Sequence, residues 1–245
     1  MARGIHDFPT DATALFPLRA SAGGALLLAG TALLAAVQPL GRTGQDLALA
    51  LYAVVGVLVL RGLGWHRPHR RFGIANCVTL SRAAAVALLA GVWADGLALT
   101  PPVRWALVAI AVAAFGADGL DGWLARRRGL VSAFGARFDM EIDALFVLIL
   151  ALLVEASGQA GGFVLASGAL RYLFVAAGAL LPALRAPLPP SYRRKAICVV
   201  QIACLVGALA PVVPAAAAQA LCAAALALLV YSFAADCRAL LAGAG

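Results

Sequence analysis

The stretch that decides the fold is residues 118–143, which read DGLDGWLARRRGLVSAFGARFDMEID. It joins the end of one long apolar run to the start of the next, and the short basic segment between them marks a turn. Both runs are rich in Ala, Leu and Val and lack the alternation of a strand, so the stretch predicts a hairpin of two helices. Four aspartates lie on this hairpin: Asp118, Asp121, Asp139 and Asp143.

Apolar runs of the same kind fill most of the chain. Of its 245 residues, 64% are hydrophobic and only 12% are charged, with a mean hydropathy of +0.96. A soluble domain is about 45–50% apolar and about 25% charged, so lipid is predicted to be the solvent for most of this protein. Helices satisfy their own backbone hydrogen bonds in lipid. Eight transmembrane helices are predicted, at about 20–38, 46–63, 74–94, 103–126, 133–154, 161–184, 195–212 and 215–236.

The basic residues predict the orientation of these helices. Of the 19 Lys and Arg residues, 15 lie at the inner face if the N-terminus is inside, Arg82 and Arg171 lie within spans, and only Arg42 and Arg104 lie outside. Because Lys and Arg concentrate in cytoplasmic loops, both termini are predicted to be cytoplasmic, as in a multi-pass protein of a bacterial inner membrane. The net charge of +8 is explained by basic residues in cytoplasmic loops, where they can also contact anionic lipid headgroups. No nucleic-acid partner is expected.

The four aspartates are predicted to lie in the inner half of the membrane, where each charge costs at least about 2.5–3.5 kcal/mol. Asp118 and Asp121 share a helix face at i, i+3, and the other two share one at i, i+4. In an antiparallel hairpin Asp121 and Asp139 both lie roughly 9 Å from the turn, so the two pairs meet at matched depths. Such a cluster of hard oxygen ligands, without His or Cys, favours Mg²⁺ or Mn²⁺.

Small and basic residues beside the aspartates suit a substrate that carries phosphate. Gly119, Gly122 and Ala125 keep the helix surface low, and Arg126 begins a run of three arginines that suits an anionic diphosphate. Each feature alone has a simpler explanation, since glycines pack membrane helices and arginines mark cytoplasmic ends. Four intramembrane aspartates have no comparable structural explanation, and they favour an enzyme that binds a metal and a phosphate.

The pattern D-x2-D-G-x2-A-R-x8-G-x3-D-x3-D in this stretch resembles the signature of the CDP-alcohol phosphatidyltransferase family. Weaker similarities are an N-x-x-T-x-x-R motif that ends at Arg82 and an S-x3-K-x5-Q motif that ends at Gln201. The resemblance covers about 74–236. It implies an all-α integral membrane protein with a six-helix catalytic core, to which this chain adds two N-terminal transmembrane helices. The signature is matched at Asp118, Asp121, Gly122, Ala125, Arg126, Gly135, Asp139 and Asp143.

The resemblance also implies a reaction. Members of this family transfer a phosphatidyl group from CDP-diacylglycerol, or a related CDP-alcohol, to the hydroxyl of an acceptor alcohol, and CMP leaves. By this resemblance the four aspartates hold one or two Mg²⁺ or Mn²⁺ ions, and Asp143 is the general base. The residues implied for the nucleotide site are Asp118, Gly122, Ala125 and Arg126.

The acceptor is not identified by the sequence. Arg194 and Cys198 depart from the phosphatidylglycerophosphate synthase branch of the family, so glycerol phosphate, serine, inositol phosphate and phosphatidylglycerol all remain open. Arg171, within a span, needs an anionic partner, which could be Glu141, Glu155 or a substrate phosphate. Glu141 is also spaced to pair with Arg137 at i, i+4. The predicted acceptor-binding residues are Arg82, Arg137, Arg171, Arg193, Arg194 and Lys195.

Two other functions are considered. A divalent-cation transporter would also carry intramembrane carboxylates, but it would spread them across the membrane depth. A catalytically inactive relative that serves as a membrane interaction protein would be expected to lack an aspartate, and none is missing. A homodimer remains open. The predicted segments are a cytoplasmic N-terminal stretch (1–19), a two-helix extension (20–63), a basic juxtamembrane segment (64–73), the catalytic domain (74–236) and a cytoplasmic tail (237–245).

Overall fold

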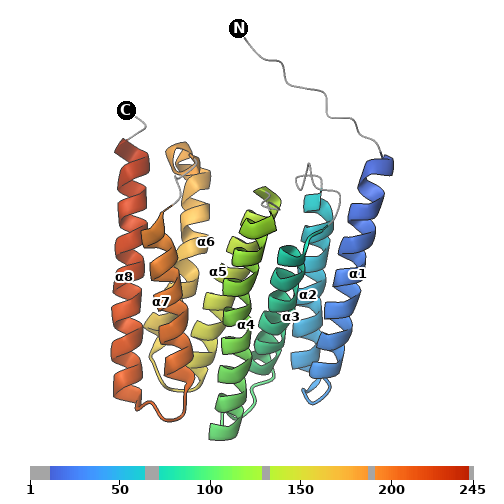
Figure 1. Ribbon diagram of the computed structural model, residues 1–245. Helices are drawn as coiled ribbons and strands as arrows, with labels where there is room; N and C mark the ends of the chain where they lie inside the picture. Colours follow the sequence, from blue (N-terminus) through green and yellow to red (C-terminus); the bar gives the residue numbers. More distant parts are fainter. Residues whose placement is uncertain (1–11, 64–71, 129–132, 187–190, 243–245) are drawn as a thin grey trace.

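The computed structural model describes residues 12–63, 72–128, 133–186 and 191–242, with the side chains of 12–17, 118–128, 133, 182 and 185 excepted. These residues are helical throughout, apart from short turns and connecting segments, and contain no strand (Figure 1). The helices are α1 (Ala12–Ala36), α2 (Arg42–Gly62), α3 (Ile74–Ala94), α4 (Pro101–Arg128), α5 (Ala133–Ala156), α6 (Leu165–Leu180), α7 (Tyr192–Leu209) and α8 (Ala215–Ala242), with 3-10 turns at Gly162–Val164 and Pro182–Arg185.

The helices run alternately up and down in one bundle, which confirms the predicted all-α membrane fold (Figure 1). We call the end at which α1 begins and α8 ends the upper end, as Figure 1 shows it. Among the described residues, five helices are long and apolar enough to cross a membrane. In α4 the described side chains, those of Pro101–Ala117, form a shorter apolar segment.

The helix bounds differ from the predicted spans in several places. Helix α1 begins eight residues before the predicted span, and α8 continues to Ala242, beyond the predicted end at 236. The predicted span 161–184 is a shorter α-helix with a 3-10 turn at each end, and Gly161 and Pro182 lie at these transitions. The predicted juxtamembrane segment 64–73 lies largely outside the described residues.

Helix α3 is surrounded by other helices and contacts α1, α2, α4 and α5. Of its apolar window 56% is buried, against 17–33% for the other four candidate spans. A helix that is covered on most sides can carry a buried polar face only if the polar groups on it have hydrogen-bond partners. Asn76, Thr79 and Arg82 form such a face, each at most 5% exposed.

The N-terminal extension packs closely on α3 through small residues. A side chain at Gly44 would place its Cβ 2.7 Å from the carbonyl oxygen of Gly91, so the two backbones touch only because both residues are glycine. Beside this contact, the backbone N–H of Gly41 donates to Asp95 Oδ2 at 2.9 Å. Helices α1 and α2 are therefore fixed to the helix that carries Arg82.

At the lower end, Arg104 joins α4 to the end of α7. Its Nε donates to the carbonyl oxygen of Leu209 at 2.9 Å, and its Nη2 reaches those of Ala208 and Ala210 at 3.4 and 3.2 Å. The last carbonyls of a helix have no partner within the helix, and a buried arginine satisfies them here. This contact fixes the register between the antiparallel helices α4 and α7.

Candidate functional site

The four signature aspartates lie on the two helices predicted for them. Asp118 and Asp121 are in the last turns of α4, and Asp139 and Asp143 are in the first turns of α5. The helical spacing therefore holds for both pairs. The side chains of Asp118, Asp121, Gly122, Ala125 and Arg126 lie outside the described residues, so the roles predicted for them stay predictions.

Arg82 binds both described aspartates. Its Nη1 donates to Asp139 Oδ1 at 2.6 Å, and its Nη2 donates to Asp143 Oδ1. Two carboxylates one helical turn apart repel each other, and a guanidinium with several donors offsets that repulsion. The structure thus places Arg82, which the sequence analysis grouped with the acceptor residues, against the predicted metal ligands.

The exposure of these three side chains shows which way the site opens. The Arg82 side chain is 1% exposed, whereas those of Asp139 and Asp143 are 39% and 24% exposed. The arginine therefore forms the buried floor of the cluster, and the carboxylates form its accessible side. Arg82 lies eight residues after the first residue of α3, about 12 Å along the helix from the upper end.

The donor chemistry of this cluster fits a hard divalent cation. Asp139 and Asp143 present carboxylate oxygens to the same guanidinium, and neither His nor Cys accompanies them among the groups shown to contact Arg82. Within the described side chains no group of three or more His, Cys, Asp or Glu residues forms a metal site. The predicted site needs Asp118 and Asp121 as well, and their side chains are not among those described.

The register between α4 and α7 brings basic residues to the depth of the first aspartate. Arg104 lies level with Leu209, and the helices are antiparallel. Asp118 is 14 residues after Arg104, and Lys195 is 14 residues before Leu209. The backbones at Asp118 and Lys195 are therefore at similar depth, and α4 and α7 pack against each other.

Arg193 and Arg194 share one acidic partner on α8. Arg193 Nη2 and Arg194 Nη1 both donate to Asp236 Oδ1, the latter at 3.2 Å. Arg193 also lies over the ring of Tyr231, with 5.9 Å from the guanidinium carbon to the ring centre. Asp236 is only 6% exposed, so the pair of arginines offsets a buried charge and holds the start of α7 against α8.

The two remaining predicted acceptor residues lie elsewhere. Arg171 Nη2 contacts Glu141 Oε1 at 2.5 Å, which confirms that Arg171 has an anionic partner and identifies it among the three alternatives. Glu141 does not pair with Arg137. Arg137 is instead exposed in the wall of a groove between α2 and α5. The six predicted acceptor residues are thus divided among several places.

Gln201 was noted in the sequence only as part of a weak motif, and the structure gives it more weight. It is 1% exposed, and among the described residues neither its Nε2 nor its Oε1 has a hydrogen-bond partner. It lies nine residues into α7, and Asp143 lies ten residues into α5, so the two are at similar depth on helices that pack together. A buried amide without partners is costly and is a candidate for binding water or substrate.

Comparison with known proteins identifies the group to which this arrangement belongs. The family model described as CDP-alcohol phosphatidyltransferase matches residues 72–231, which is 160 of the 245 residues. The match starts at Phe72, after α1 and α2, and covers α3 to α7 and more than half of α8. No curated protein and no solved structure matches the chain.

Proposed function

Because the chain belongs to the CDP-alcohol phosphatidyltransferase family, its class of reaction is phospholipid head-group transfer from a CDP-alcohol, and we propose that it moves a phosphatidyl group from CDP-diacylglycerol to an acceptor alcohol. The observation that carries the proposal is the contact of Arg82 with Asp139 and Asp143. It brings both aspartates of the second half of the signature to one buried guanidinium, with their carboxylates on its accessible side. No observation favours a transporter or an inactive relative.

The proposed reaction is a displacement at phosphorus. The acceptor's hydroxyl oxygen forms a bond to the phosphorus that carries diacylglycerol, the bond from that phosphorus to the bridging oxygen breaks, and CMP leaves with the bond's electrons. The hydroxyl proton passes to the carboxylate of Asp143 as general base. Bound Mg²⁺ or Mn²⁺ would offset the charge of the diphosphate. We propose that Asp118, Asp121, Asp139 and Asp143 hold one or two such ions.

For the nucleotide we propose the segment of α4 that ends at Arg126. Its backbone is helical, and Gly122 and Ala125 would allow a close approach of the cytidine diphosphate. We also propose that the upper end faces the cytoplasm, because most Lys and Arg residues fall there. In this orientation the segment 74–236 is the catalytic domain, and residues 20–63 form an extension that is packed on it.

The proposed division of labour between Asp143 and Asp121 gives the first prediction. If Asp143 is the base, Asp143→Asn should abolish CMP release while the affinity for CDP-diacylglycerol stays within about threefold of wild type, since removing a proton acceptor spares ground-state binding. Asp121→Asn should weaken that affinity at least about tenfold, because it removes a ligand of the metal ion that would offset the charge of the diphosphate. Both values can be measured by binding of a fluorescent donor analogue. Equal weakening in the two variants would make Asp143 a ligand only.

For the acceptor we propose the start of α7. Lys195 is exposed, lies level with Asp118, and follows two arginines that Asp236 holds in place. Together these groups leave a net positive charge at the upper end of α7, which suits an acceptor bearing phosphate. Arg171 is assigned to the packing of α5 and α6, because Glu141 already offsets its charge.

The second prediction tests this acceptor site. Lys195→Gln should raise the KM for a phosphate-bearing acceptor about fivefold to tenfold, the effect of one lost charged contact, and leave the KM for CDP-diacylglycerol nearly unchanged. CMP release with glycerol phosphate, inositol phosphate, serine and phosphatidylglycerol identifies the acceptor first. Arg238→Gln is the control, because it removes an exposed arginine of α8 at the same, upper end of the bundle. A parallel rise in both KM values would place Lys195 in the donor site.

A further inference from the structure

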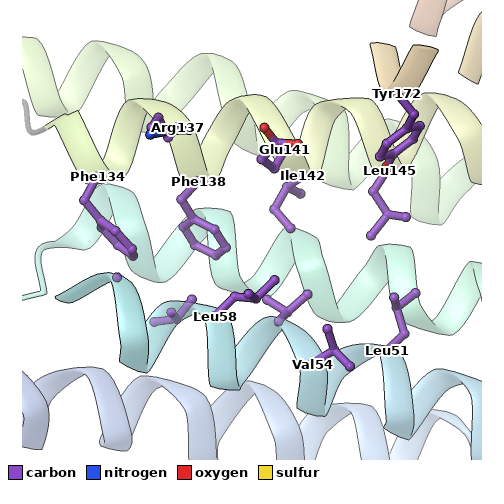
Figure 2. Close-up of a pocket in the computed structure, with 13 residues that line it drawn as sticks. Leu51, Val54, Leu58, Phe134, Arg137, Phe138, Glu141, Ile142, Leu145 and Tyr172 are labelled. Atoms are coloured by element: carbon purple, nitrogen blue, oxygen red, sulfur yellow. The ribbon is translucent and has the colours of Figure 1, made fainter. Parts of the chain in front are cut away.

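A groove separates α2 from the upper half of α5 (Figure 2). Its volume is about 560 Å³. In Figure 2, Phe134 and Phe138 point from α5 toward α2, and Leu51, Val54 and Leu58 point back from α2. Nearly all of the lining is apolar, and its charged members are Arg137 and Glu141.

The groove lies on a different face of α5 from the aspartates. Phe134, Phe138 and Leu145 follow one another at spacings of four and seven residues and therefore share one face. Asp139 and Asp143 contact Arg82 of α3 from another face. One helix thus separates the groove from the proposed catalytic cluster, and the groove's other wall is a helix outside the matched family segment.

The length of the groove matches one leaflet of a bilayer. On α2 it runs from Leu51 to Gly62, and on α5 from Phe134 to Leu145, eleven residues along each helix. This corresponds to roughly 16 Å, about half of the ~30 Å hydrocarbon core. The groove starts at the upper end, where the Phe134 ring packs so closely on Gly62 that a side chain there would collide with it. Its dimensions are those of an acyl chain that extends from headgroup depth toward the membrane centre.

The charge of the groove wall is not balanced. Glu141 is paired with Arg171, whereas Arg137 is exposed and has no ion pair or hydrogen bond within the described part of the chain. Arg137 lies one turn below the start of α5, close to the depth of lipid phosphates in the proposed orientation. An apolar channel of leaflet length with an arginine near its mouth is complementary to an amphiphile with an anionic head.

We propose that this groove binds one phospholipid with an anionic headgroup, with an acyl chain between α2 and α5 and the phosphate against Arg137. The proposal depends on the membrane placement that the family gives and not on the catalytic roles of the aspartates. The bound lipid would fill the space between the N-terminal extension and the catalytic helix α5, and so couple the extension to the site.

The test uses full-length protein that has been stripped of lipid in mild detergent. Native mass spectrometry then follows titration with dioleoyl phosphatidylglycerol or dioleoyl phosphatidylcholine. Wild type is expected to retain one phosphatidylglycerol, about fivefold more tightly than phosphatidylcholine, since one basic residue near a lipid surface contributes that much. Arg137→Gln should remove this preference, and Leu58→Trp, which fills the groove, should remove the tight site for both lipids.

Matched controls keep the result interpretable. Arg238→Gln removes another exposed arginine of the upper end, and Leu60→Trp enlarges an exposed leucine of α2 that does not line the groove. Both should bind as wild type does. Asp139→Asn should also retain the lipid, which separates this site from any binding of phosphatidylglycerol as an acceptor.

Three results would overturn the proposal: equal retention of the two lipids by wild type, variants that match their controls, or a change of oligomeric state in Leu58→Trp. The last would make the groove an interface with a second copy. CMP release by the same preparations tests the proposed function separately, because the lipid measurement contains no CDP-alcohol.

Discussion

Replacing Asp139 by Asn is expected to lower kcat by a factor of about 10³ or more, because a metal ligand contributes several kcal/mol to charge stabilisation in the transition state. Asp139 is the more exposed of the two carboxylates on Arg82, at 39%, and it opens toward the accessible side of the site. The amide keeps the size of the side chain but lacks the charge that a divalent cation requires. CMP release from CDP-diacylglycerol in saturating Mg²⁺ or Mn²⁺ measures the effect.

Removal of the metal should reproduce the loss in the unaltered protein. EDTA is expected to stop CMP release by wild type, and added Mg²⁺ or Mn²⁺ should restore it, whereas Asp139→Asn should not recover. Asp46→Asn, which neutralises an exposed carboxylate in the first turns of α2, is the control and should retain activity. Undiminished turnover in EDTA would rule out the metal-dependent mechanism, even if Asp139 itself proved essential.

Replacing Arg82 by Gln is expected to have the largest effect on stability. It removes the cation from between two carboxylates, and the cost should be about 2–3 kcal/mol, below the 3–5 kcal/mol for a fully buried pair because both aspartates are partly exposed. The destabilisation should be greater in EDTA than in Mg²⁺, since a bound divalent ion would offset the same repulsion. Thermal unfolding in detergent under both conditions measures the difference.

Two further variants make this result specific. Arg82→Lys keeps the charge but cannot reach both carboxylates with a planar fork, so it should fall between wild type and Arg82→Gln. Arg238→Gln should unfold as wild type does. If Arg82→Gln loses the same stability with and without Mg²⁺, the metal does not offset the repulsion that Arg82 offsets, and the expected link between arginine and metal is wrong.

The local features of this protein could be predicted well from its sequence. The helical hairpin followed from apolar runs on either side of a basic turn, and the spacing of the aspartates places each pair on one face of a helix. The match to the family confirms the recognition that this signature allowed. These predictions depend on neighbours within a few residues, where helical geometry fixes the outcome.

Contacts between distant helices could not be predicted in the same way. Arg82 and Asp139 are 57 residues apart in the sequence, and Arg193 and Asp236 are 43 apart. In the sequence, an arginine that will bind a phosphate looks the same as one that will pair with a carboxylate or face water. The sequence analysis therefore placed six basic residues in one acceptor site. The register of the helices assigns Arg82 to two aspartates, Arg171 to Glu141, and Arg193 to Asp236.

Gln201 shows a second limit. Its position in an apolar helix is equally compatible with a contact to lipid, to a neighbouring helix or to a substrate. Only the packed structure shows that its amide is enclosed and lacks partners within the described part of the chain, because burial and hydrogen bonding are properties of the whole bundle.

The lower end of the bundle has a consequence for where the lipid product is deposited. Arg104 ties α4 to the last carbonyls of α7, so the two helices that flank the proposed site converge on a fixed contact away from it. In the proposed orientation, substrates and products would exchange at the upper end, and the finished phospholipid would enter the leaflet on that side. Growth of a bilayer needs material in both leaflets. In the proposed orientation, supply of the opposite leaflet therefore falls to a separate lipid-translocating protein, and synthesis by this enzyme alone would make the membrane asymmetric.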